Sequence, residues 1–177
     1  LSILHRVGTE AEEREEYLRF APWKADRDGE PSLPPERFAE MAEKEQFILT
    51  VCANGYGKLS SAYEYRRIGR GGQGIVNIDN IERNGPVVAS FSATKSDQLI
   101  LVTDSAKLIR IGLDTLRVIG RNSAGVRLFD VAKNEKVVAT VRLDEQADPE
   151  NDSEEAIVEE MVGRGSPETT PHTTIDR

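Results

Sequence analysis

The chain has 177 residues, of which 38% are hydrophobic, and it carries a formal net charge of −8 at pH 7. This length suits one domain of ordinary size, and the low hydrophobic share indicates that part of the chain lies outside a packed core. No apolar run approaches the roughly eighteen residues of a membrane span. The single cysteine, Cys52, excludes a disulfide framework and indicates a reducing compartment.

The charge is distributed unevenly along the chain. Residues 1–45 contain 7 Lys or Arg against 12 Asp or Glu, residues 46–143 contain 14 against 8, and residues 144–177 contain 2 against 11. A segment with a net charge of +6 therefore lies between two acidic segments. Because the local field decides which polyanion can approach, the central segment is a candidate for binding one.

The chain begins at Leu1 rather than Met, and we expect it to be a fragment. Residues 1–7 resemble the strand-like residues 87–93, which predicts that they are the last strand of an earlier repeat. Residues 8–45 then interrupt the repeat. We interpret them as a helical insertion, which either decorates the edge of the next unit or binds a partner.

Two short helices are predicted in this insertion. Thr9 and Glu12 have the spacing of a capping box, Thr9 as N-cap, and the helix that they open would run to about Phe20. A second helix is expected after Pro35, where Phe38 and Met41 have helical spacing.

Residues 46–143 contain one unit twice, about fifty residues apart. The corresponding stretches are 46–50 and 98–102, 69–75 and 120–126, and 87–89 and 137–139. Short strands repeated with this period are typical of propeller-type blades. Neither copy could bury its hydrophobic face alone, so each needs a neighbour. We predict an all-β fold with blades at 46–95 and 96–143.

Each blade contains several predicted strands. The apolar runs 47–51 and 99–102 indicate inner strands buried on both faces. Cys52 would then be a buried thiol. Stretches rich in β-branched residues predict further strands at 75–78, 126–131 and 137–141. Asn84-Gly85 and Lys133-Asn134 are expected to be hairpin turns.

A glycine-rich stretch precedes residue 75 and matches G-x-G-x-x-G. Dinucleotide binding would require a helix after it, whereas residues 75–78 are strand-like. We expect instead a box-like loop whose glycines permit positive φ, formed by Gly69, Gly71, Gly72, Gln73 and Gly74. Its N–H groups could face phosphate oxygens. It could equally be a plain turn between blades, and both descriptions can hold together.

Basic residues cluster around this loop and around the corresponding loop of the second copy, and we expect Lys58 and Lys107 to occupy matching positions. Such recurrence indicates a basic perimeter, which would bind a phosphate backbone without reading base sequence. A solvated charged surface is the alternative. The predicted contacts to duplex DNA are Lys58, Arg66, Arg67, Arg70, Lys107, Arg117, Arg121 and Arg127.

No catalytic or metal-binding residue is predicted in this segment. The sequence lacks a Walker A loop, a Cys/His set with metal-ligand spacing, and a credible nucleophile triad. Residues 144–177 are acidic and almost lack aromatic residues, so we expect a disordered tail.

Several short motifs follow one another in order along the repeats: 54–58, 83–85, 101–104 and 118–122, then Gly125-Val126. With them the chain resembles the last blades of the DNA gyrase A family. The resemblance implies a β-pinwheel, a propeller-like domain whose blades exchange strands and whose basic rim wraps duplex DNA. Residues 68–74 keep only Arg70, Gly71, Gly72 and Gly74 of the family's first-blade box, so this loop resembles the degenerate box of a later blade.

The resemblance also implies a place in a larger enzyme. The segment would support ATP-dependent negative supercoiling by a type II topoisomerase without being catalytic itself. ATP and Mg²⁺ are implied for the whole enzyme and no cofactor for this segment. The implied partners are duplex DNA, gyrase B and a second copy of gyrase A, and the implied location is the cytoplasm, at the nucleoid. The alternatives are the corresponding part of topoisomerase IV and a non-enzymatic propeller scaffold that binds proteins.

Overall fold

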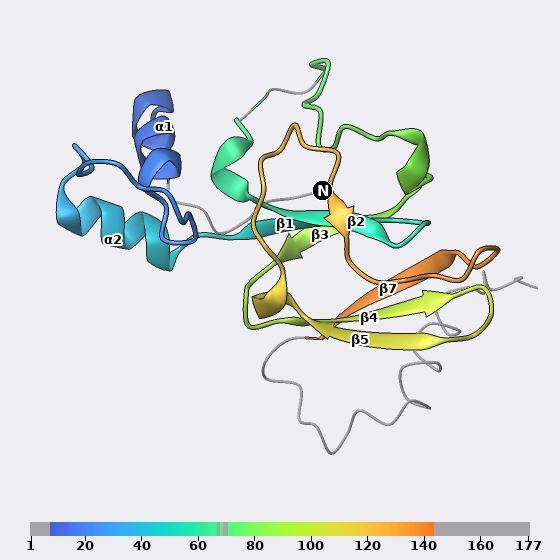
Figure 1. The fold of residues 1–177 in the computed structure, drawn as a ribbon. Helices are drawn as coiled ribbons and strands as arrows, with labels where there is room; N and C mark the ends of the chain where they lie inside the picture. The colour runs from blue at the N-terminus through green and yellow to red at the C-terminus, as the bar shows by residue number, and fades with distance from the viewer. Residues whose placement is uncertain (1–7, 67, 69–70, 144–177) are drawn as a thin grey trace, which may run out of the picture. The chain divides into compact units, whose positions relative to one another are not determined.

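A computed structural model of the chain describes residues 8–66, 68 and 71–143 (Figure 1). They form two α-helices followed by two antiparallel sheets. The predicted all-β fold of residues 46–143 is confirmed, since their only helical pieces among the described residues are three single 3-10 turns. The predicted strand at 1–7 and the predicted tail at 144–177 lie outside the described residues, as do Arg67, Gly69 and Arg70.

The two helices are α1 (Ala11–Phe20) and α2 (Pro35–Glu43). The predicted N-cap of α1 is wrong by one residue. Glu10 takes that place, because its carbonyl accepts the first helical bond from the Arg14 N–H at 3.2 Å and its own N–H donates to Glu13 at 3.2 Å. Pro35 opens α2, where its missing N–H costs nothing. Neither helix is long and apolar enough to cross a membrane, and the same holds for the rest of the described chain.

The helices pack on the first repeat through a small aromatic cluster. Tyr17, Ala21 and Met41 are fully buried against Tyr63, which lies in the 3-10 turn η1 (Ala62–Glu64). The Tyr17 and Tyr63 rings meet edge to face with centroids 5.0 Å apart. The Tyr63 hydroxyl also donates to the Met41 carbonyl oxygen at 3.0 Å. The predicted insertion is therefore docked on the sheet that follows it.

The first sheet contains strands from both repeats. Its order is β3-β1-β2-β6, where β1 is Phe47–Cys52, β2 is Tyr56–Ser61, β3 is Val87–Ala93 and β6 is Val126–Arg127. The last of these comes from the second repeat and pairs with the start of β2. The exchange of a strand between repeats ties them together along the sheet.

The second sheet repeats the first with one strand fewer. Its order is β5-β4-β7, with β4 Gln98–Thr103, β5 Leu108–Gly112 and β7 Val137–Leu143. The register shifts between Val51 and Cys52 in one sheet and between Val102 and Thr103 in the other, at corresponding positions. Each hairpin is also followed by a 3-10 turn, η1 in the first repeat and η3 (Leu113–Thr115) in the second.

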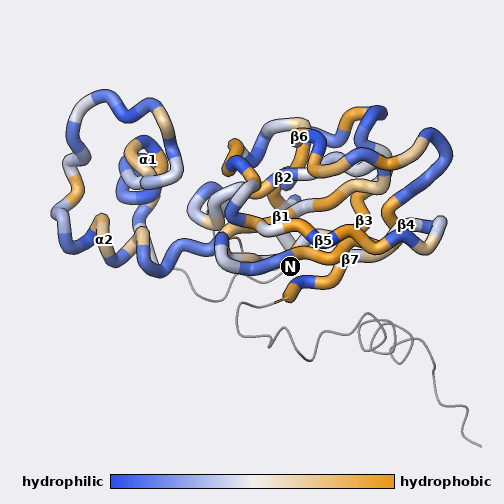
Figure 2. Tube along the Cα trace, turned by 60° about the horizontal axis from the view of Figure 1, so that its bottom comes forward, coloured by the Kyte–Doolittle hydropathy of each residue, from blue (hydrophilic) through white to orange (hydrophobic). Residues whose placement is uncertain are grey.

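One hydrophobic core joins the two sheets. Its fully buried members include Leu49 and Val51 of β1 and Leu99 and Leu101 of β4. Figure 2 shows these inner strands as apolar segments, while the connecting loops are largely polar. The predicted burial of the runs 47–51 and 99–102 is confirmed, except that Val102 is only partly buried. Cys52 is a buried free thiol, as predicted, and burial raises its pKa.

Two predicted strands need correction. Residues 75–78 form no strand. In the second repeat the corresponding residues form β6, which pairs with a strand of the preceding repeat. Residues 75–78 have no such partner, because no strand of an earlier repeat is among the described residues. The strand predicted at 126–131 is only Val126–Arg127, because Arg127 already faces Tyr56, the first residue of β2. Beyond it the Leu128 N–H turns back to the Gly55 carbonyl at 2.9 Å.

Candidate nucleic-acid interface

Two arginines from different repeats lie on one tyrosine ring. The guanidinium carbons of Arg83 and Arg127 lie 4.9 and 5.4 Å from the centre of the Tyr56 ring. Arg127 also donates to the Tyr56 hydroxyl at 3.0 Å and pairs with Asp130 at 2.6 Å. Both arginines are exposed. A guanidinium has several N–H donors, so one that lies over a ring still has donors for a phosphate.

A tight turn before β2 positions this ring. Gly55 adopts φ +80°, and a Cβ there would lie 2.6 Å from the Phe129 carbonyl oxygen, so only glycine fits. Asn54 donates to the Arg83 carbonyl at 2.8 Å and accepts from Lys136 Nζ at 2.6 Å. Lys136 is exposed and comes from the second repeat. Tyr56, Arg83, Arg127 and Lys136 are called the Tyr56 cluster below.

Arg127 was among the contacts predicted from the sequence, whereas Arg83 and Lys136 were missed. Arg83 was visible only as the first residue of the Arg83-Asn84-Gly85 turn. Its contact with Tyr56 joins residues from different loops. The sequence marked this position only as part of the short motif at 83–85; the charge pattern gave no sign that Arg83 contacts Tyr56.

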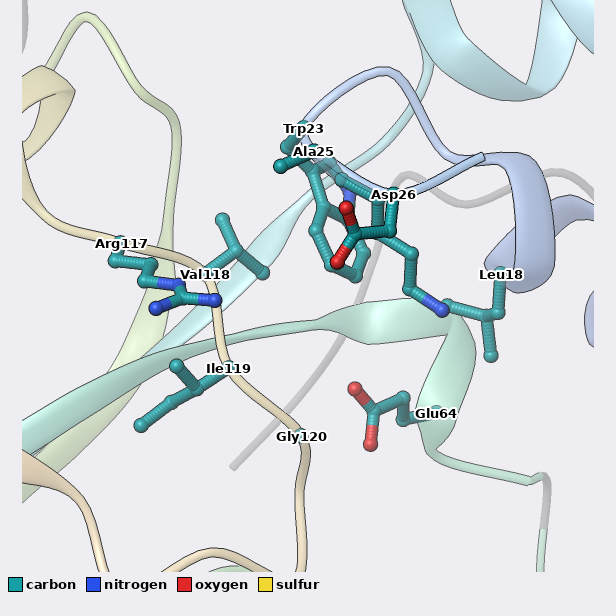
Figure 3. A pocket seen from close by; sticks show the side chains of 10 residues that line it. Leu18, Trp23, Ala25, Asp26, Glu64, Arg117, Val118, Ile119 and Gly120 are labelled. Carbon is teal, nitrogen blue, oxygen red and sulfur yellow. The ribbon is translucent and has the colours of Figure 1, made fainter. Parts of the chain in front are cut away.

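A second basic group lies beside the helical insertion. Arg117 contributes to a hollow of about 780 Å³ whose opposite wall includes Trp23 and Asp26 (Figure 3). A neighbouring hollow of about 270 Å³ is lined by Arg66 and Arg121, together with residues of α1. Arg66 and Arg117 are exposed and Arg121 is partly buried.

The two hollows share Leu18 and Glu64, so the predicted residues Arg66, Arg117 and Arg121 lie along one edge. Arg121 is fixed by bonds to the first repeat, donating from its side chain to the Val76 carbonyl and from its N–H to Glu64 at 2.6 Å. Carboxylates from α1 and the following loop, Glu15 and Asp26, line the same hollows. This edge is therefore less purely basic than the Tyr56 cluster.

Lys58 does not lie on the rim, contrary to the prediction. Its side chain is fully buried, and its ammonium group donates to the Gly120 carbonyl at 3.1 Å and to the Arg121 carbonyl. Burial lowers its pKa to about 8. Nor do Lys58 and Lys107 correspond: Lys58 faces Thr50, and the matching residue in the second sheet is Ile109, which faces Leu101.

Lys107 is exposed but already paired. Its Nζ lies 2.8 Å from a carboxylate oxygen of Glu135, which also accepts bonds from Thr103 and Ser105. These partners, Lys107 first, lower the pKa of Glu135 to about 2. Lys107 remains a predicted DNA contact, although the Glu135 carboxylate already neutralises part of its charge.

The described part of the box-like loop is exposed. Gly71 and Gly74 have φ of +79° and +80°, which confirms that glycine is needed for the backbone at these two positions. Gly72 and Gln73 are exposed beside them. No α-helix follows the loop within the described chain, so the loop lacks the context of a dinucleotide site. Its contact with phosphate stays a prediction.

Two sheets of one pattern, joined by an exchanged strand, define a propeller-type repeat protein with basic turns. The family model described as DNA gyrase C-terminal domain, beta-propeller, matches residues 46–93 and 97–144. The chain belongs to this family.

Relatives that bear the name of the A component of DNA gyrase extend the similarity beyond the repeats. The gyrase A protein of Rickettsia conorii is 41% identical over 165 residues, 87% of this chain and 18% of that protein. That of Rickettsia bellii is 40% identical over 94% of this chain and 19% of its own length. That of Salmonella typhimurium is 38% identical over 72% of this chain. The chain thus spans less than a fifth of the length of these relatives.

Two solved structures share the fold. The C-terminal domain of DNA gyrase A aligns with a TM-score of 0.52 and 22% identity, covering 55% of this chain and 33% of that one. The C-terminal domain of DNA topoisomerase IV aligns with a TM-score of 0.53 and 19% identity, covering 68% and 36%.

Proposed function

We propose that this chain is a DNA-binding and DNA-wrapping part of DNA gyrase A. The observation that carries the proposal is the Tyr56 cluster, in which residues of both repeats place three exposed cations around one turn: Arg83 and Arg127 at the Tyr56 ring, and Lys136 bonded to Asn54. Membership in the gyrase C-terminal domain family supports it. The gyrase A names of the relatives favour gyrase over topoisomerase IV.

The interface would act on the DNA backbone rather than on base sequence. Arg83, Arg127 and Lys136 are long cationic side chains at turns, and phosphate oxygens are the groups that such donors bind without specificity. Because Arg127 also binds Asp130, its approach to DNA would exchange a solvent-exposed ion pair for a phosphate contact. Exposed ion pairs are worth about 0–1 kcal/mol, so this exchange costs little.

The wider roles follow from the relatives and are part of the same proposal. Wrapping would present DNA to the cleavage core of the whole enzyme, a type II topoisomerase. The partners would be gyrase B and a second copy of gyrase A, at the nucleoid in the cytoplasm. ATP and Mg²⁺ would act elsewhere in that enzyme. In the described part of this chain no three His, Cys, Asp or Glu side chains are grouped as metal ligands, so no Mg²⁺ site is proposed here.

The test is the affinity of the 177-residue chain for a labelled duplex, measured against salt concentration. Neutralising about six phosphates gives a log–log slope on the order of −5. The double variant Arg83→Glu/Arg127→Glu should lose affinity and flatten the slope. Arg27→Glu, an exposed position in the acidic insertion, is the control for a single charge reversal, to be compared with Arg83→Glu alone, and should change little. A flat salt dependence in the unsubstituted chain would favour the protein-binding scaffold and reject the proposal.

A further inference from the structure

Lys58 is a charged side chain with no exposed surface, and its place in the first sheet needs an explanation. It lies in β2 opposite Thr50, and its side chain reaches across to a loop of the second repeat. Burying an ammonium group is costly unless its protons are bonded. Here its acceptors are the backbone carbonyls of Gly120 and Arg121. A hydrogen bond from an ionised donor is about twice as strong as a neutral one.

The neighbours of Lys58 fasten the same loop. The Ser60 hydroxyl donates to the Ile119 carbonyl at 2.8 Å, and the Ile119 N–H donates to the Leu59 carbonyl at 2.9 Å. Glu64 accepts the Arg121 N–H at 2.6 Å. Residues 119–121 therefore lie along β2 and η1 of the first repeat, with Lys58 bonded at their centre.

The fold does not itself require a lysine at this position. Ile109 occupies the matching place in the second sheet, where it faces Leu101 and is partly buried. An apolar side chain is thus compatible with the sheet. Lys58 differs from Ile109 in the loop that it contacts. Lys58 bonds to the Gly120 carbonyl, and Arg117 and Arg121 lie on either side of Gly120 in the sequence.

We propose that Lys58 is a positioning residue, whose ammonium group fixes the loop of residues 119–121 in the conformation in which Arg117 and Arg121 reach DNA. This inference rests on the proposed DNA-binding function. Both forms of the amine can donate to the two carbonyls, but bonds from the charged ammonium are about twice as strong. The loop would therefore be held more firmly below the pKa of Lys58 than above it. Two charged groups face the ammonium: Glu64 favours its protonated form, and Arg121 disfavours it.

The sign of the pH effect follows from burial. The pKa of Lys58 is lowered from 10.5 to about 8, chiefly by loss of hydration. As the pH rises from 7 to 9, the folded protein therefore loses this proton while its arginines stay charged. DNA affinity of the unsubstituted chain should decline over this interval.

The experiment compares the unsubstituted chain with Lys58→Met in duplex binding at pH 7 to 9 and fixed salt. Met has a similar length and no charge. We expect Lys58→Met to bind about tenfold more weakly at pH 7 and to have a flat pH profile. Ile109→Met, at the matching position of the other sheet, is the control and should keep both affinity and profile.

Amide hydrogen exchange of Arg121 provides a readout that does not depend on DNA. Exchange, corrected for intrinsic rate, should be faster in Lys58→Met, and faster at pH 9 than at pH 7 in the unsubstituted chain. If Lys58→Met fails to fold, the exchange and binding profiles of the unsubstituted chain decide alone. Equal binding and exchange in both chains would overturn the role of Lys58 while leaving DNA binding intact. Absence of duplex binding by the unsubstituted chain would instead reject the proposed function.

Discussion

Gly125 lies directly on the backbone of Gly57, so that a Cβ at Gly125 would be 2.6 Å from the Gly57 carbonyl oxygen. This approach occurs where the second repeat enters the first sheet, since the next residue, Val126, pairs with Gly57. Gly125 also has φ +84°, a conformation that favours glycine. The exchanged strand thus depends on two glycines that no other residue type could replace without movement.

Gly125→Ala should destabilise the described fold strongly. Left-handed backbone at a non-glycine residue costs about 1–2 kcal/mol, and the close carbonyl adds the cost of displacing β6 or β2. Gly74→Ala is the matched control, because Gly74 is the corresponding residue of the first repeat, has φ +80° and has no atom within 4 Å of an added Cβ. In urea unfolding, Gly125→Ala should lose at least about 1 kcal/mol more than Gly74→Ala. Equal losses would mean that the carbonyl contact is unimportant.

Glu45 connects the insertion to the first repeat. Its carboxylate accepts hydrogen bonds from the Tyr17 hydroxyl at 2.8 Å, Trp23 Nε1 at 3.0 Å and the Ser61 hydroxyl at 2.5 Å. Burial nevertheless raises its pKa, and these bonds only reduce the shift. A raised pKa contributes stability that is fully present below the ordinary value of 4.5 and is lost as the pH rises through the folded value.

We therefore expect the free energy of unfolding of the unsubstituted chain to fall relative to that of Glu45→Gln as the pH rises from about 4 towards neutrality. Taking the difference cancels the titration of the other carboxylates. Trp23 is the only tryptophan, so its fluorescence reports on this contact directly. Glu45→Ala should expose Trp23 and shift its emission to the red at all pH values. A pH-independent difference would contradict the predicted direction of the pKa shift.

The Tyr56 ring should matter for DNA binding through the arrangement of its arginines, not through charge. Tyr56→Leu leaves Arg83 and Arg127 charged but removes the ring on which both lie. At exposed sites each such contact is worth about 0.5–1 kcal/mol, so loss of both should lower affinity about five- to thirtyfold. The salt slope should stay the same because the number of cations does not change. Tyr56→Phe, which keeps the ring, is the control; a changed slope in Tyr56→Leu would show that a cation had been lost.

The strands that are buried on both faces could be located from the sequence. The apolar runs at 47–51 and 99–102 identify β1 and β4, because a short run of consecutive apolar residues is typical of a strand that is buried on both faces. The prediction failed for residues 75–78, because a β-branched stretch forms a strand only where a partner is available. The period of about fifty residues indicates that each repeat needs a neighbouring repeat, but it does not show which residues form the strand that pairs with that neighbour.

The candidate site was harder to predict because its contacts cross between repeats. Lys58 was assigned to the rim because charge is visible in a sequence and burial is not. Its partners are the carbonyls of Gly120 and Arg121, 62 and 63 residues away. The contact of Arg83 with the Tyr56 ring likewise depends on the turn at Gly55. Backbone acceptors and ring faces have no residue-type signal, so only the structure brings these groups together.

The acidic residues 144–177 should weaken DNA binding by the basic repeats. They carry 11 Asp or Glu against 2 Lys or Arg, directly after a segment with a net charge of +6. A tethered polyanion acts at high effective concentration, and salt screens it. Deletion of residues 145–177 should therefore tighten duplex binding, most at low salt, as measured by titration at low and moderate ionic strength. Replacing the same residues with a Gly/Ser segment of equal length controls for the loss of chain. If affinity is unchanged in both variants, the segment does not compete with DNA, and if it falls, the segment supports binding and the expected sign is wrong.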